Sequence, residues 1–237
     1  MIAWRIFHKQ TTCSTNNDAL SGSHGDVFTA DFQTAGRGRI GHKWLSKAGM
    51  NLAMSAVVDV SSLSLESAST FPLVVGLAVA RGLNRFLTRH SALVKWPNDI
   101  FVDGRKVAGI LCERHGDNLI AGIGVNVTQK EFPEEIASRA TSLALLENKA
   151  FSVGAVRGAI LEELAVCYEK WVSLGFEALY EELSMIDFLK GRAIAVRQTD
   201  DDPSPVEGVC GGIQKDGSLD VGGEKVFAGE AHVEEAL

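Results

Sequence analysis

The segment from Gly36 to Trp44 combines arginines and glycines at a spacing that suits a small anion. Arg37 and Arg39 stand two positions apart. In an extended segment such side chains point to the same side, and the planar guanidinium group suits two-point contact with carboxylate or phosphate. Residues 32–58 contain four cations and no acid. A solvated basic loop is the alternative, but Trp44 and the absence of acids favour a ligand-binding loop.

A second cluster, Lys95-Trp96-Pro97-Asn98-Asp99, places a lysine, an amide and a carboxylate within one turn. Asp99 is suited to hold Mg²⁺ or to position a partner group, and Lys95 is suited to meet phosphate. The structural alternative is a sharp turn with Trp96 packed in the core. Both interpretations stay open at this point.

Glycines recur inside the strands that are predicted to follow this turn. Gly109, Gly122 and Gly124 weaken a sheet unless some group must approach its surface closely, and a flat ligand is one such group. Lys106 precedes the first of these strands, and Asn126 ends the second with an amide that can donate and accept.

The pattern Gly36-x-Gly38-x-x-Gly41 also matches a dinucleotide-binding fingerprint. That fingerprint requires a helix to begin at the third glycine, since the helix N-terminus holds the pyrophosphate. The residues after Gly41 have no helical periodicity, and no Lys-Ser/Thr pair follows to make a phosphate-binding P-loop. No Ser-His-Asp or Cys-His arrangement indicates a nucleophilic enzyme.

Charge and hydropathy narrow the class of protein. The net charge is −7, and residues 200–237 contribute ten acids against two lysines, so residues 1–199 are nearly neutral. A duplex nucleic acid requires a broader basic face, and we expect no nucleic-acid partner. No apolar run reaches the roughly 18 residues of a membrane span. Because the N-terminus does not resemble a signal peptide, we expect a cytoplasmic protein without membrane association. Four widely spaced cysteines predict no metal site made by protein side chains alone.

Alternating and helical patterns predict an α+β protein. The predicted strands in the first part of the chain are residues 4–9, 27–33, 51–60, 93–96, 100–102, 107–113 and 119–127. A polar turn at 14–18 is predicted to cap a helix beginning near Asp18. Longer helices are predicted at 66–89 and 152–174, with a shorter one at 176–183. Short strands at 192–196, 208–213, 218–221 and 225–227, with an Asp-Gly hairpin signal at 216–217, predict a small β module. We place the domain boundary at 188/189.

Four segments in order resemble the successive motifs of the biotin–protein ligase family. They are Gln33-x-x-Gly-Arg-Gly-Arg-x-Gly-x-x-Trp44, Lys95 to Asp99, Lys106-x-Ala-Gly-Ile110 and Gly122-x-Gly-x-Asn126, and Ser14-Thr15-Asn16 resembles the family's first biotin-contacting turn. The resemblance implies a class II synthetase-like mixed-sheet catalytic domain at 1–188 and a small SH3-like β-barrel at 189–237. It implies an enzyme that activates biotin with ATP to biotinyl-5′-AMP and transfers biotin to a lysine of a biotin carboxyl carrier type acceptor.

The resemblance also assigns roles by position. Lys106, Arg37 and Arg39 are the implied catalytic residues. The implied biotin contacts are Ser14, Thr15, Asn16, Gln33, Gly36, Arg37, Gly38, Arg39, Lys106, Gly109, Gly122 and Gly124. The implied ATP contacts are Arg37, Arg39, His42, Trp44, Lys95, Asn98, Asp99 and Asn126. Mg²⁺ is expected to enter with ATP, with Asp99 as a candidate ligand, and the protein is expected to be a monomer or a homodimer.

Two departures from the family and two alternatives accompany this assignment. His42 stands where many members carry a third arginine, which predicts weaker or pH-sensitive phosphate binding. The family's DNA-binding winged helix is not expected, and neither is operator binding. The alternatives are a lipoate or octanoate ligase or transferase of the same fold, and a non-catalytic biotin-binding regulator. The loop at 36–49 is expected to become ordered over its ligands.

Overall fold

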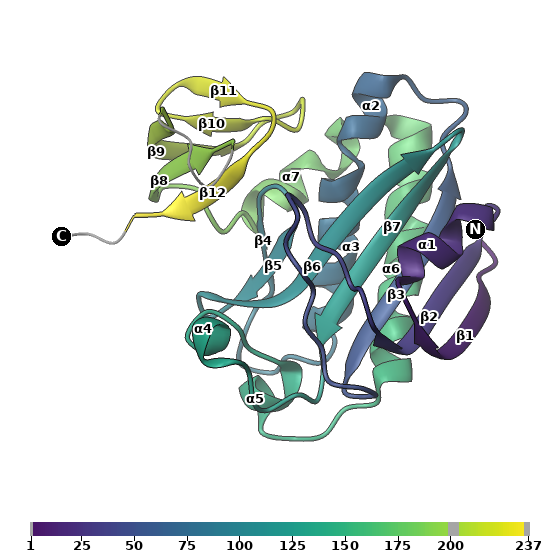
Figure 1. The fold of residues 1–237 in the computed structure, drawn as a ribbon. Helices are drawn as coiled ribbons and strands as arrows, with labels where there is room; N and C mark the ends of the chain where they lie inside the picture. Colours follow the sequence, from purple (N-terminus) through teal and green to yellow (C-terminus); the bar gives the residue numbers. More distant parts are fainter. Residues whose placement is uncertain (1, 199–203, 235–237) are drawn as a thin grey trace.

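The protein folds around two β-sheets, which Figure 1 shows side by side. The computed structural model describes residues 2–198 and 204–234. The larger sheet has seven strands and the smaller one five. The expected α+β fold with a C-terminal β unit is confirmed. Among the described residues no helix has the length and apolarity required to cross a membrane.

The larger sheet is mixed and runs in the order β1-β2-β3-β7-β6-β5-β4. Only β1 and β2 are parallel, and every other neighbouring pair is antiparallel. β3 and β7 lie at its centre and are almost wholly buried, because apolar and small residues occupy both of their faces. The bounds are β1 Arg5–Thr12, β2 Asp26–Gln33, β3 Asn51–Asp59, β4 Leu93–Lys95, β5 Asp99–Val102, β6 Arg105–His115 and β7 Asn118–Asn126.

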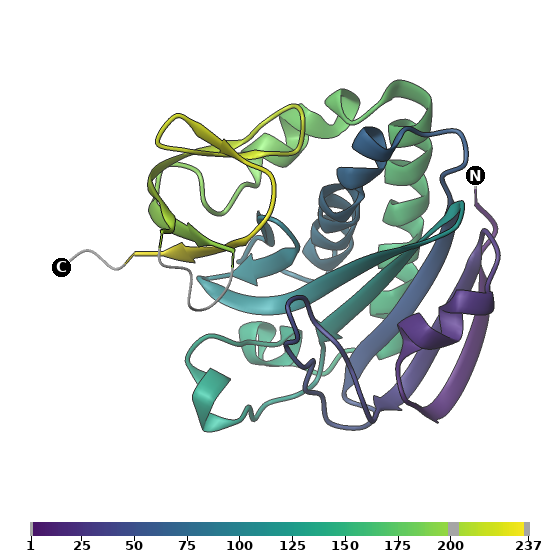
Figure 2. The same cartoon turned by 45° about the horizontal axis from the view of Figure 1, so that its top comes forward.

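Two long helices, α3 (Phe71–Asn84) and α6 (Val153–Leu174), cover one face of this sheet. They pack against each other and contribute most of their apolar residues to the core. Phe71 stacks on Trp171 with ring centroids 5.2 Å apart. Ser152 caps α6 as predicted, since its side chain accepts a hydrogen bond from the Ala155 amide at 3.3 Å. The opposite face of the sheet is left for the short helix α1 and the loop at 34–50, as Figure 2 shows.

The prediction of one continuous helix at 66–89 is wrong. The chain forms α2 (Leu65–Ser69) and then restarts as α3 at Phe71. Pro72 lacks an amide proton and its ring clashes with the carbonyl four residues earlier, so a helix can begin there but not continue through it. α3 then ends at Asn84, whose side-chain oxygen accepts a hydrogen bond from the Ala92 amide.

Other short elements differ from the prediction or were missed. The helix expected near Asp18 begins earlier, so that α1 (Thr15–Asp18) is the polar turn itself, followed by the 3-10 turn η1 (Ala19–Ser21). The short helices α4 (Glu134–Ala137) and α5 (Leu143–Glu147) and the last strand, β12, were not predicted. They contain too few residues for a periodic pattern to emerge.

The smaller sheet is antiparallel and runs in the order β11-β10-β9-β8-β12. The Asp216-Gly217 turn is confirmed: the Gln214 amide donates to the Ser218 carbonyl, and Gly217 has a φ of 82°. Apolar residues of this sheet belong to the same core cluster as the larger sheet. A division of the chain at 188/189 therefore stays a prediction. α7 (Glu177–Met185) leads to β8 Ala193–Arg197, β9 Val206–Ile213, β10 Leu219–Val221, β11 Glu224–Val226 and β12 Glu230–Val233.

Candidate functional site

A pocket of about 730 Å³ lies where the loop at 34–50 crosses β6 and β7. All but one of the residues assigned a catalytic or binding role line it: Ser14, Thr15, Asn16, Gln33, Arg37, Gly38, Arg39, His42, Trp44, Lys95, Asn98, Asp99, Lys106, Gly109, Gly122, Gly124 and Asn126. Gly36 stands just behind the lining, where its carbonyl accepts a hydrogen bond from the Trp44 amide at 3.1 Å. Segments far apart in the sequence thus meet in one cavity.

The arginine-containing loop is a tight hairpin. The Gly38 amide donates to the His42 carbonyl at 2.7 Å, and Arg37 pairs with Lys43 as an isolated antiparallel bridge. The tip lies at Ile40 and Gly41, which both have positive φ, 49° and 78°. Glycine adopts that conformation without steric cost. The loop therefore has a defined shape in this structure.

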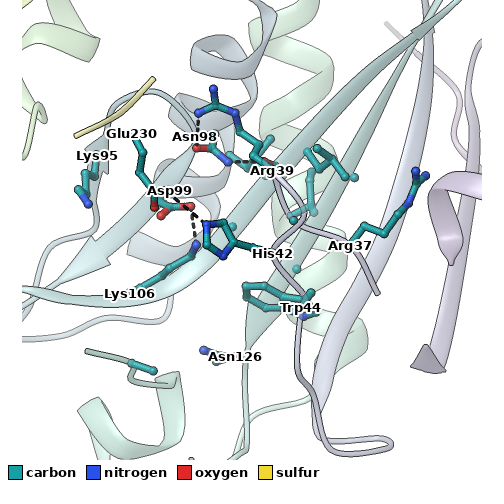
Figure 3. A pocket seen from close by; sticks show the side chains of 18 of the residues that line it. Arg37, Arg39, His42, Trp44, Lys95, Asn98, Asp99, Lys106, Asn126 and Glu230 are labelled. Carbon is teal, nitrogen blue, oxygen red and sulfur yellow. Dashed lines mark hydrogen bonds and ion pairs between the residues drawn. The ribbon is translucent and has the colours of Figure 1, made fainter. Parts of the chain in front are cut away.

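Arg37 and Arg39 point in opposite directions, contrary to the prediction (Figure 3). Arg37 donates to Asn17 Oδ1 at 2.9 Å and to Glu113 Oε2 at 3.1 Å. Arg39 donates to Asn98 Oδ1 at 3.3 Å and to the Gly229 carbonyl at 3.2 Å. Side chains alternate between two sides only in extended backbone, and the extended backbone ends at Gly38. Arg39 is the first residue of a turn, in which its carbonyl accepts a hydrogen bond from the His42 amide.

One half of the pocket is cationic. Lys106 Nζ lies 2.7 Å from Asp99 Oδ1, the ion pair drawn in Figure 3. Burial lowers the pKa of Lys95, which Asp99 and Glu230 partly oppose. Burial likewise lowers the pKa of the Arg39 guanidinium against the same two carboxylates. Three cations, Lys95, Lys106 and Arg39, thus stand beside two carboxylates, Asp99 and Glu230, and the excess positive charge favours an anionic ligand.

The structural interpretation of the turn at 95–99 is confirmed, and the ligand-binding interpretation stays a prediction. Trp96 is buried and its Nε1 donates to the Gly217 carbonyl at 3.1 Å, which fastens the turn to the β9–β10 hairpin. Asn98 Nδ2 donates to the Ile110 carbonyl at 2.6 Å. Lys95 and Asp99 are opposite residues in the antiparallel register of β4 and β5. The contacts of Trp96 and Asn98 fix the turn, and in this position Lys95 and Asp99 line the pocket.

The opposite half of the pocket offers neutral hydrogen-bonding groups. Ser14 and Thr15 are buried at the start of α1. Thr15 donates to Gln33 Oε1 from its amide at 2.8 Å and from its hydroxyl at 3.1 Å. This arrangement suits a polar but uncharged group that both donates and accepts.

The strand glycines admit close approach, as predicted, but side chains fill the space in this structure. A Cβ atom on Gly124 would lie 2.4 Å from Trp44 Cε2, and one on Gly109 would lie 3.1 Å from Trp44 Cζ3. A Cβ atom on Gly122 would lie 2.2 Å from Asn16 Oδ1. Trp44 Nε1 is buried there without a hydrogen-bond partner. The Trp44 indole thus occupies the space that Gly109 and Gly124 leave open.

Several lining residues were missed by the sequence analysis. Glu230 lies 3.5 Å from His42 Nε2, and only tertiary packing brings this acidic C-terminal segment to the loop. Asn126, a predicted ATP contact, lines the pocket, and its Nδ2 donates to the Thr141 carbonyl at 3.0 Å. Other missed residues with polar or aromatic side chains include Phe132, Arg139, Phe188, Arg192 and His232. They lie in segments without a local motif.

Comparison with known proteins places the chain in a family. The model of the biotin/lipoate A/B protein ligase family matches residues 6–130, more than half of the chain. A biotin--[acetyl-CoA-carboxylase] ligase of Mycobacterium tuberculosis is 36% identical over 168 residues, which cover 68% of this chain and 62% of that protein. The bifunctional ligase/repressor BirA of Bacillus subtilis is 33% identical over 162 residues, 65% of this chain. The chain spans about half of that relative, 47% of its length.

Solved structures agree with this placement. The biotin protein ligase from Aquifex aeolicus in complex with biotin and ATP superposes with a TM-score of 0.86 at 28% identity, covering 98% of this chain and 99% of that one. A biotin protein ligase from Leishmania major in complex with biotinyl-5-AMP gives a TM-score of 0.68 at 26% identity, with 98% of each chain covered. The chain belongs to the biotin/lipoate A/B protein ligase family.

Proposed function

We propose that this protein activates biotin with ATP and transfers the biotinyl group to a lysine of an acceptor protein of the biotin carboxyl carrier type. The observation that carries the proposal is a single pocket with a neutral hydrogen-bonding half, at Thr15 and Gln33, beside a cationic half, at Lys106 and Arg39. Biotin has the matching polarity, since its ureido ring is neutral and its side chain ends in a carboxylate. The relatives named as biotin ligases support the same assignment.

In the first step a biotin carboxylate oxygen attacks the α-phosphorus of ATP. The bond to the β-phosphate breaks, and biotinyl-5′-AMP and pyrophosphate are formed. In this step two anions, the biotin carboxylate and the triphosphate, must approach each other. Cations that are held in place lower the barrier, because they offset the repulsion between the two anions and the negative charge that develops in the transition state. Lys106 lies in the cationic half of the pocket, 2.7 Å from Asp99, and is assigned this role together with Arg39.

In the second step the acceptor lysine amine attacks the carbonyl carbon of the mixed anhydride, and AMP leaves. No covalent bond to the enzyme is required in either step. The pocket supplies orientation: Ser14, Thr15 and Gln33 fix the ureido ring, and the turn at 95–99 with Asn126 and Trp44 lines the space for the nucleotide.

Mg²⁺ is proposed to enter with the nucleotide. Sites of this kind use one or two carboxylates together with phosphate oxygens and water, and Asp99 is a carboxylate in the cationic half. The described residues contain no cluster of three or more His, Cys, Asp or Glu side chains that would hold a metal without the nucleotide. The donor set thus fits a nucleotide-borne ion, which supplies charge neutralisation of the polyphosphate.

The test is pyrophosphate release with MgATP and biotin, lipoate or octanoate in parallel, followed by labelling of a biotin carboxyl carrier domain. We expect turnover with biotin. Turnover with lipoate or octanoate alone would contradict the proposal and favour the other branch of the family. Lys106→Ala is expected to lower the adenylation rate at least about 100-fold, and Lys170→Ala, an exposed lysine on α6, serves as the matched control.

A further inference from the structure

We propose that Glu113 is a positioning residue that holds the arginine-containing loop closed and ties it to the neutral half of the pocket. Glu113 stands on β6 behind the lining residues. One carboxylate oxygen, Oε2, accepts hydrogen bonds from two different elements: from Asn16 Nδ2 of α1 at 2.5 Å and from Arg37 of the loop at 3.1 Å.

Asn16 is fixed on every side. It is 4% exposed, and its Oδ1 accepts a hydrogen bond from the Ser55 hydroxyl at 2.6 Å. Its Nδ2 donates to the Leu111 carbonyl at 3.2 Å as well as to Glu113. Gly122 leaves the space for this amide. Because all of these contacts are to protein groups, Asn16 acts as a rigid arm that orients the Glu113 carboxylate.

This orientation of the Glu113 carboxylate strengthens the contribution of its ion pair with Arg37 to loop closure. The Arg37 and Glu113 side chains are 48% and 35% exposed, and a pair of that kind contributes little when both partners must be ordered. Here the buried Asn16 amide has already ordered the carboxylate. Asn17, one residue further along α1, offers its Oδ1 to the same guanidinium nitrogen at 2.9 Å. α1 and β6 therefore receive Arg37 at a preformed site.

The arrangement links ligand binding to loop closure. Thr15 and Asn16 are neighbours on α1, and the Ser55 hydroxyl lies 2.8 Å from Thr15 Oγ1 and 2.6 Å from Asn16 Oδ1. Because Thr15 and Arg37 line the same pocket, a ligand bound at Thr15 favours the loop position that Glu113 holds through Arg37. We call the contacts of Arg37 with Glu113 and Asn17 the latch. That the ligand is biotin rests on the proposed function, whereas the latch itself does not.

Limited trypsin digestion tests the latch without any ligand. The loop contains four cleavage sites, Arg37, Arg39, Lys43 and Lys47, and cleavage requires local opening. Glu113→Gln removes the charge but keeps an acceptor for Asn16, so the fold is retained; Glu113→Ala removes both. We expect cleavage in the loop to be about two- to ten-fold faster in Glu113→Gln and faster still in Glu113→Ala. Wild-type cleavage rates in both variants would overturn the proposal.

Glu162→Gln is the matched control, because Glu162 pairs with Arg85 at 2.6 Å on the helical side of the molecule. Its loop cleavage is expected to equal that of the wild type. If loop and distant sites were cut equally faster in Glu113→Gln, the residue would be merely structural, and the proposal would fail.

Steady-state kinetics gives a second measurement. Glu113→Gln is expected to raise the KM for biotin about two- to ten-fold with little change in kcat, since it shifts loop closure and not the reacting groups. A fall in kcat at unchanged KM would contradict the positioning role. If biotin is not the substrate, this measurement fails while the ligand-free digestion still reports the latch, so the two proposals fail separately.

Discussion

Replacing Gly122 with alanine is expected to destabilise the protein strongly, because the new methyl group would clash with the buried Asn16 side chain. Its Cβ would lie 2.2 Å from Asn16 Oδ1 and 2.9 Å from Asn16 Cγ. The amide cannot move aside without breaking the hydrogen bonds with Ser55 and Glu113. Overpacking costs about 1–3 kcal/mol, and each buried polar group left without a partner costs about 1–3 kcal/mol.

Overpacking together with one such unpaired group comes to about 2–6 kcal/mol, a large part of a typical free energy of unfolding of about 5–15 kcal/mol. For a domain of this size each kcal/mol shifts the Tm by about 2–4 °C, so thermal unfolding is expected about 4–24 °C below the wild type.

Gly158→Ala is the matched control. Gly158 lies within α6, and a Cβ atom there would meet no atom within 4 Å. In a helix interior the same substitution stabilises by about 0.5–1 kcal/mol. Thermal melts followed by circular dichroism compare the two variants. A Gly122→Ala protein that melts at or above the wild-type temperature would refute the steric reasoning.

Three further predictions follow from other contacts. Gly124→Ala would bring a Cβ atom to 2.4 Å from the Trp44 ring; since Trp44 belongs to a surface loop, we expect a Tm within about 4 °C of the wild type and a roughly ten-fold weaker nucleotide affinity by calorimetry. His42 Nε2 lies 3.5 Å from Glu230, and an arginine at this position would carry a permanent positive charge, so His42→Arg is expected to bind ATP more tightly than the wild type by calorimetry; equal affinities would contradict this. Burial raises the pKa of Asp216, but hydrogen bonds from Lys225 and Ser218 outweigh it and lower that pKa to about 2; this stability is present above pH 4 and lost as pH falls toward 2, so urea midpoints should fall more in the wild type than in Asp216→Asn.

The strands around the pocket could be predicted because their local patterns agree with their environment. The strand at 51–60 is continuously apolar or small because β3 is buried on both faces. The motifs around Lys106 and Asn126 come together because β6 and β7 form one hairpin, in which Gly109 pairs with Gly124. Adjacent antiparallel strands turn a sequence order into a spatial one.

The parts that could not be predicted depend on contacts between distant segments. Nothing near Arg39 indicates that its guanidinium meets the Gly229 carbonyl, 190 residues away. Glycines at 109 and 124 indicate close approach, but the sequence does not say that the approaching group is Trp44. Glu113 has no motif at all, since its role arises only where α1, β6 and the loop converge.

The C-terminal unit contacts the site at two points through its main chain. Trp96 donates to the Gly217 carbonyl and Arg39 to the Gly229 carbonyl, so the acceptors at both points are peptide groups. A peptide oxygen survives almost any side-chain replacement around it, provided the backbone keeps its path. Apart from pocket-lining residues such as Glu230 and His232, the C-terminal unit is therefore free to diverge in sequence without altering its contacts with the pocket. Gly229 itself is the constraint, because a Cβ atom there would lie 2.8 Å from the Arg197 carbonyl oxygen.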